Sequence, residues 1–77
     1  MAEKKFPKGS EEWMMFMDFW ALCQKYWEPE KSDTWWEKVI DETESFVNKY
    51  GTNFAKRLGL ALIDDLERRS RKKWESH

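Results

Sequence analysis

Residues 34–66 read TWWEKVIDETESFVNKYGTNFAKRLGLALIDDL, and this stretch decides the fold. Before Gly51, apolar side chains recur every three to four residues and charged ones fall on the opposite side, which is the pattern of an amphipathic helix. The same period returns after Gly51, a residue that readily adopts the left-handed conformation past a helix end. Because neither part alternates with a period of two, the stretch predicts helices over 34–50 and 53–72 and no strand.

Both predicted helices carry signals for their first residue. Thr34 followed by Glu37 is typical of a capping box, and Asp33 is the alternative N-cap one residue earlier. Thr52 or Asn53 caps the second helix of the pair, since both residue types can accept a hydrogen bond from the first helical turn. The short connection predicts that the two helices form an αα-hairpin.

A third helical pattern precedes this pair. Ser10 is a favourable N-cap, and two glutamates follow it in the first turn, where the helix dipole favours acids. Pro29 ends the pattern, because the residue before a proline avoids the helical conformation. With helices over 11–28, 34–50 and 53–72, the chain is predicted to be an all-α three-helix bundle.

The chain has room for one domain with a small core. A protein of 77 residues buries only about 60% of its unfolded surface. We expect a single three-helix domain over 10–73, with disordered segments at 1–9 and 74–77. Helical periodicity predicts the following core side chains: Phe16, Phe19, Trp20, Cys23, Trp36, Val39, Val47, Leu58, Leu62 and Leu66.

The last helix has one small residue in its interior. Gly59 costs about 1 kcal/mol there relative to alanine, and with Ala55 one turn earlier it makes a shallow groove. We expect a tryptophan from a neighbouring helix to fill that groove. Leu60 points toward the polar side and is predicted to be exposed.

The first helix is more apolar than a three-helix bundle requires. Its apolar side chains cover about 220° of the helix circumference, whereas contact with two neighbours needs about 140–180°. With Phe16, Phe19 and Cys23 turned inward, two apolar flanks remain. One flank carries Met15, Leu22 and Tyr26, and the other carries Trp13, Met17, Trp20 and Trp27.

We choose the tryptophan-rich flank as the contact surface for another protein or for a second copy of the chain, because tryptophan is the commonest interface anchor. Trp13→Ala and Met17→Ala are expected to weaken binding by about 1 kcal/mol or more each. The alternative is that the other two helices cover this flank. In that case both substitutions would lower the melting temperature, and the contact surface would lie elsewhere.

The sequence offers no catalytic or metal-binding set. The only histidine is His77, the last residue, and the only cysteine is Cys23, which lies among apolar residues. There is no Gly-rich phosphate loop, so we expect neither an enzyme nor a cofactor. Cys23 is predicted to be a buried, inert thiol. No signal peptide or membrane-length apolar run is evident, so we expect a cytoplasmic protein without membrane contact.

A small DNA-binding regulator is the alternative function. The second and third predicted helices resemble a helix-turn-helix in length and spacing. The residues that would contact nucleic acid are Asn53, Lys56, Arg57, Arg68, Arg69 and Arg71. A structural explanation competes with it, because Asp64, Asp65 and Glu67 each stand four residues before one of these arginines, the spacing of helix ion pairs.

Residues 49–55, KYGTNFA, and 60–70, LALIDDLERRS, resemble small helical proteins encoded by bacteriophages and mobile elements of Gram-positive gut bacteria. The resemblance extends over about residues 34–71. It implies a phage or mobile-element accessory protein, a group that includes inhibitors of host proteins. It transfers no functional residues.

Overall fold

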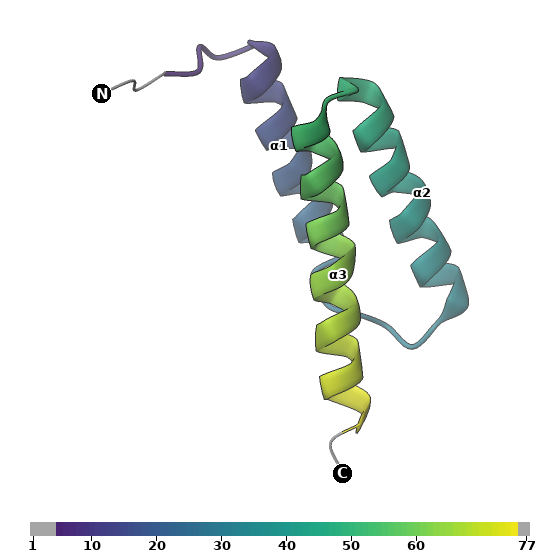
Figure 1. The fold of residues 1–77 in the computed structure, drawn as a ribbon. Coiled ribbons are helices and arrows are strands. Elements are labelled where there is room, and N and C mark those ends of the chain that lie inside the picture. The colour runs from purple at the N-terminus through teal and green to yellow at the C-terminus, as the bar shows by residue number, and fades with distance from the viewer. Residues whose placement is uncertain (1–4, 76–77) are drawn as a thin grey trace.

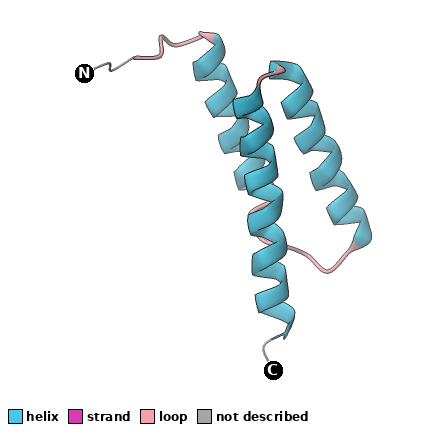
Figure 2. Ribbon diagram, viewed as in Figure 1, coloured by secondary structure: helices cyan, strands magenta, loops and turns pink. Residues whose placement is uncertain are grey.

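A computed structural model describes residues 5–75 of the chain. It contains three α-helices: α1 at Glu11–Lys25, α2 at Asp33–Tyr50 and α3 at Asn53–Glu75. The chain runs along α1, returns along α2 and reverses again in α3, which contacts both other helices (Figure 1). Residues 5–75 consist of helices and loops, with no strand among them (Figure 2). The predicted all-α three-helix bundle is confirmed.

Side-chain oxygens cap α1 and α3 as expected. Ser10 Oγ accepts a hydrogen bond from the Trp13 backbone N–H at 3.2 Å. Thr52 Oγ1 accepts one from the Ala55 backbone N–H at 3.0 Å. Each bond satisfies a backbone donor that has no partner within the helix, and this fixes the first residue of the helix.

The start of α2 differs from the prediction. Neither Thr34 nor Asp33 is the N-cap. Ser32 is, and its Oγ accepts a hydrogen bond from the Trp35 backbone N–H at 3.4 Å. Because the Ser32 backbone is extended (φ −146°, ψ 127°), its hydroxyl faces the first turn. Asp33 then lies in that turn, where the helix dipole stabilises its negative charge.

The helix ends also differ in part. Gly51 is left-handed (φ 61°) after α2, as predicted. The first helix stops at Lys25, three residues before the expected end at 28. Tyr26 leaves the helical conformation (φ −121°) and turns its ring into the core. Pro29 therefore follows the end of α1 at a distance and does not itself set it.

The third helix is longer than predicted. It continues through Trp74 to Glu75, so the expected disordered segment at 74–77 does not begin at Trp74. Lys72 and Lys73 lie in the last turn, where the negative end of the helix dipole stabilises their positive charges. The expectations for residues 1–4 and 76–77 lie outside the described residues.

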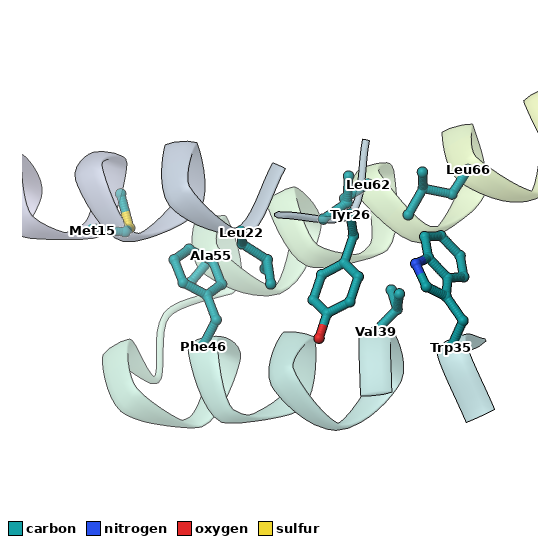
Figure 3. Close-up of a cluster of buried hydrophobic side chains, with 9 residues drawn as sticks. All are labelled: Met15, Leu22, Tyr26, Trp35, Val39, Phe46, Ala55, Leu62 and Leu66. Atoms are coloured by element: carbon teal, nitrogen blue, oxygen red, sulfur yellow. The ribbon is translucent and has the colours of Figure 1, made fainter. Parts of the chain in front are cut away.

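Buried apolar side chains from all three helices form one core (Figure 3). Val39, Leu62 and Leu66 belong to it, as predicted. The full set is Met15, Leu22, Tyr26, Trp35, Val39, Phe46, Ala55, Leu62 and Leu66. Five other predicted core residues are partly buried and pack against this set: Phe19, Cys23, Trp36, Val47 and Leu58.

Two core predictions on the first helix are wrong. Phe16 is 38% exposed and Trp20 is 62% exposed. The buried row of α1 is instead Met15, Leu22 and Tyr26. Because the helix is apolar around most of its circumference, its own pattern does not decide which side turns inward, and contacts with the other helices do.

Helices α2 and α3 pack tightly against each other at Gly59. A Cβ atom at this position would lie 2.8 Å from Thr43 Cγ2 and 3.0 Å from Val47 Cγ2. The expected tryptophan is therefore not the group that fills the groove. Two small β-branched side chains of α2 pack there instead, since the helices are too close for a ring.

Two equivalent polar contacts fix the rotation of α1 against α2. Lys25 Nζ lies 2.9 Å from a Glu42 carboxylate oxygen, and the Tyr26 hydroxyl donates to the same carboxylate. In Figure 3 the Tyr26 hydroxyl points toward α2. We call this arrangement, in which a lysine and the tyrosine after it bind one carboxylate of the other helix, a Lys-Tyr clamp.

The second clamp reverses the roles of the two helices. Lys49 Nζ of α2 lies 2.8 Å from Asp18 Oδ2 of α1, and the Tyr50 hydroxyl donates to the same oxygen. In both clamps the lysine follows an acid of its own helix by seven residues and the tyrosine follows it by eight. The antiparallel pair is therefore closed at both ends by the same arrangement of residues.

The clamps shift the pKa values of their members. Hydrogen bonds from Lys49 and Tyr50 lower the pKa of Asp18 below its ordinary 3.8. Hydrogen bonds from Tyr26 and Lys25 lower the pKa of Glu42 below its ordinary 4.5. Burial, and then the bonded carboxylate, raise the pKa of each tyrosine above its ordinary 10.0.

The lowered carboxylate pKa values predict acid sensitivity. The stability that each carboxylate contributes is present above its unfolded pKa and is lost as the pH falls through its lower folded pKa. We expect the melting temperature to fall between about pH 5 and pH 2. Because both carboxylates are more than a third exposed, each contributes less than about 1 kcal/mol, or roughly 5 °C.

Asp18→Asn should therefore lower the melting temperature at pH 7. It should also reduce the further fall of the melting temperature as the solution is acidified. Thermal melts followed by circular dichroism across this pH range measure both effects. Asp41→Asn, which changes an exposed carboxylate outside the clamps, is the matched control. An Asp18→Asn variant with the same acid dependence as the wild type would contradict a role for the clamp.

Candidate protein-binding surface

The side of α1 opposite its buried row carries large apolar side chains. We define the outward row as Trp13, Met17, Trp20, Gln24 and Trp27. Met17 is 47% exposed, Trp20 is 62% exposed and Trp27 is 52% exposed, whereas Trp13 is half-buried. The first four residues lie on α1, and Trp27 lies two residues beyond its end.

The outward row includes the four residues of the predicted tryptophan-rich flank. The alternative, that α2 and α3 cover this flank, does not agree with the exposure of Met17 and Trp20. The clamps hold one edge of α1 against α2, and Phe16 and Trp27 contact α3 at the other edge, so Met17 and Trp20 between these edges face away from both helices. Binding by the row stays a prediction.

Three phenylalanines extend this surface at the start of the helices. The Phe6 ring stacks on the Phe16 ring with centroids 5.6 Å apart, and Phe16 meets Phe54 of α3 edge-on at 5.9 Å. Phe54 is itself 51% exposed. Helical periodicity does not identify this cluster, because it depends on where the start of α3 lies beside α1.

Arg69 of α3 fixes the position of Trp27. Its guanidinium carbon lies 4.1 Å from the centre of the Trp27 ring, a cation–π distance. Arg69 Nη1 also donates to the Trp27 carbonyl oxygen at 2.7 Å, and Nε donates to Asp65 Oδ2 at 2.8 Å. One face of the ring is covered, so Trp27 is presented in a defined orientation.

A shallow hollow lies between the last two tryptophans of the row. Trp20 and Trp27 form its sides, and Cys23 and Gln24 complete its lining. Burial raises the pKa of the Cys23 thiol, and the nearby positive charge of Arg69 offsets this only in part. A raised pKa leaves little thiolate at neutral pH, so the hollow favours binding of an apolar group over thiol chemistry.

The residues of the DNA-binding alternative are divided between two environments. Asn53, Lys56 and Arg57 are exposed at the start of α3, and Arg71 is exposed near its end. The other two predicted contacts are engaged within the chain. Arg68 pairs with Asp64 at 3.2 Å, and Arg69 is held as described above.

The ion pairs agree with the structural explanation for this basic stretch. Asp64 and Asp65 pair with the arginines four residues later, at 3.2 and 2.8 Å. Within residues 5–75, the third expected pair, Glu67 with Arg71, is not formed. Acidic side chains therefore interrupt the basic surface of α3, and they would repel a nucleic-acid backbone.

Other kinds of site are not evident in the part of the chain that the structure describes. Residues 5–75 contain no group of three side chains able to hold a metal ion, and none of their helices is long and apolar enough to cross a membrane. No protein-family model, curated protein or solved structure matches the chain. The outward row of α1 is therefore the candidate binding surface of this chain.

Proposed function

We propose that this chain is a non-enzymatic protein-interaction module that binds another polypeptide through the outward row of α1. The single observation that carries the proposal is the exposure of Trp20, 62%, on a helix whose opposite side is buried. An indole in water at that position contributes nothing to the core. Tryptophan is also the residue type most enriched among interface anchors.

The surroundings of Trp20 support the same function. Met17 precedes it by one turn, and flexible methionine beside rigid tryptophan is typical of adaptable binding surfaces. Trp27 is held by Arg69, so part of the surface is ordered before a partner arrives. Preorganisation reduces the entropy lost on binding.

The setting of this activity is part of the proposal. The resemblance of residues 49–70 to small proteins of phages and mobile elements supports an accessory protein of such an element, acting in the cytoplasm. Its partner would then be a host protein or a second copy of the chain. An inhibitor of this kind works by occupying a surface of its partner, and the exposed apolar side chains of α1 suit that task.

Substitutions in the outward row test the proposal directly. Met17→Ala and Trp20→Ala should each weaken binding by about 1 kcal/mol or more, which is a fivefold or larger rise in Kd. Both side chains are about half exposed, so the melting temperature should change little. Binding is measured by quantitative capture from a lysate of producing cells and by sedimentation of the purified chain.

Leu60→Ala is the matched control, because Leu60 is 58% exposed on α3, outside the outward row. It should capture the same proteins as the wild type. A wild-type chain that is monomeric and captures nothing sensitive to Met17→Ala would overturn the proposal. Tight duplex DNA binding that weakens steeply between about 50 and 200 mM salt would instead favour the basic residues of α3.

A further inference from the structure

The outward row has the spacing of a helix–helix seam. Its four members on α1 are Trp13, Met17, Trp20 and Gln24, which follow one another at intervals of four, three and four residues. This is the heptad pattern by which two helices pack along their length. The buried row of α1 lies on the opposite side, so α1 carries one surface for its own core and a second surface with the geometry of an intermolecular contact.

The residues beside this seam carry no charge. Met14 and Ala21 flank it on one side, and Phe16 and Cys23 flank it on the other. Charged residues at such flanking positions usually select a different partner helix, and here they are absent. The one acid in this part of α1, Asp18, is held by Lys49 on the side of α2.

The seam is complementary to itself when two copies run antiparallel. In the register that pairs residues whose numbers add to 37, Met17 of each copy meets Trp20 of the other, a favourable sulfur–aromatic contact. Trp13 then meets Gln24 at the hollow beside Trp20. The Gln24 amide oxygen provides an acceptor for the indole N–H of Trp13.

The antiparallel direction also suits the helix dipoles. In an antiparallel pair the positive end of each α1 lies beside the negative end of the other, whereas a parallel pair places like ends together.

The exposed area is sufficient for a small specific dimer. Met14, Phe16, Met17, Trp20 and Trp27 are between 38 and 62% exposed. Since a large side chain of this kind removes ~150–250 Å² from water when buried, each still exposes roughly 100 Å². Two copies would therefore bury at most on the order of 1,000 Å², which is near the lower bound of specific interfaces.

We infer that the chain forms a symmetric antiparallel homodimer through the outward row of α1, with Met17 of each copy against Trp20 of the other. The inference rests on the proposed function, because it names a second copy as the partner of the same surface. The wild-type chain is then expected to sediment at twice the 9.5 kDa mass of one copy at high micromolar concentration.

Two charge variants test the interface and its register. Met17→Lys places a lysine against Trp20 of the second copy, and Trp20→Glu places a glutamate against Met17. Each variant alone should raise the dimer Kd by more than about tenfold, because two unpaired charges are buried per dimer. When the two variants are mixed, the lysine of one chain meets the glutamate of the other, and a heterodimer should form.

Sedimentation equilibrium of each variant and of the mixture measures these effects, with Leu60→Lys as a control that stays dimeric. Circular dichroism melts are expected to show that both variants are folded, since neither side chain belongs to the core. Variants that remain dimeric alone, or a mixture that remains monomeric, would overturn the inference. A monomeric wild type that captures another protein in a Met17-dependent manner would overturn the dimer but leave the proposed function standing.

Discussion

Replacing Leu62 by alanine is expected to remove a large part of the protein's free energy of unfolding. Leu62 is 4% exposed and lies in the core between α3 and the other two helices (Figure 3). Removing its branched end loses the transfer free energy of the buried carbons and leaves a cavity, which together cost about 2–5 kcal/mol. A small domain has only about 5–15 kcal/mol of stability, so the loss is a major part of the total.

Urea denaturation followed by circular dichroism measures this change as a lower midpoint with an unchanged slope. Leu60→Ala is the matched control, because the same residue type on the same helix is 58% exposed there. Leu60→Ala should change stability by no more than about 0.5 kcal/mol. Equal losses in the two variants would mean that α3 is rotated relative to the arrangement described above.

The second large effect is expected at Gly59, where α3 packs tightly against α2. A Cβ atom alone would lie 2.8 Å from Thr43 Cγ2 and 3.0 Å from Val47 Cγ2. Gly59→Leu adds further carbons to a space that two stiff β-branched side chains already occupy. We expect a loss of about 3 kcal/mol or more, even though leucine favours helix formation over glycine by nearly 1 kcal/mol.

Ala61→Leu provides the control for this substitution, since Ala61 is exposed two residues further along α3. It introduces the same side chain into the same helix without a steric conflict, so its midpoint should stay close to that of the wild type. The comparison separates the helix preference of leucine from the distance between the helices. A Gly59→Leu variant as stable as Ala61→Leu would show that α2 and α3 can move apart at little cost.

Much of the fold follows from local signals in the sequence. Ser10, Gly51 and Thr52 act as helix-end residues as their types predict, because a cap depends on hydrogen bonds within one turn. The periodicity of α2 and α3 also identifies Val39 and Leu62 as core residues. Local signals are not sufficient before α2, where Ser32, Asp33 and Thr34 can each act as a cap. There the structure has Ser32 as the N-cap.

The rotation of α1 is a different kind of problem. Its apolar residues leave several orientations open, and Phe16 and Trp20 are predicted to be in the core on that basis alone. The structure selects the orientation that allows Asp18 and Tyr26 to join the Lys-Tyr clamps. One contact joins residues that are 16 positions apart in the sequence and the other joins residues that are 32 positions apart. A local sequence pattern does not predict such contacts.

The candidate binding surface shows the same division. The sequence by itself determined that α1 carries more apolar side chains than a bundle of this size can cover, and that Trp13, Met17, Trp20 and Trp27 share one flank. Only the tertiary structure decided that Met17 and Trp20 of this flank are uncovered, that Arg69 holds Trp27, and that Phe54 lies beside Phe16. The physical reason is that periodicity records which residues share a side of a helix, whereas exposure depends on what the neighbouring helices cover.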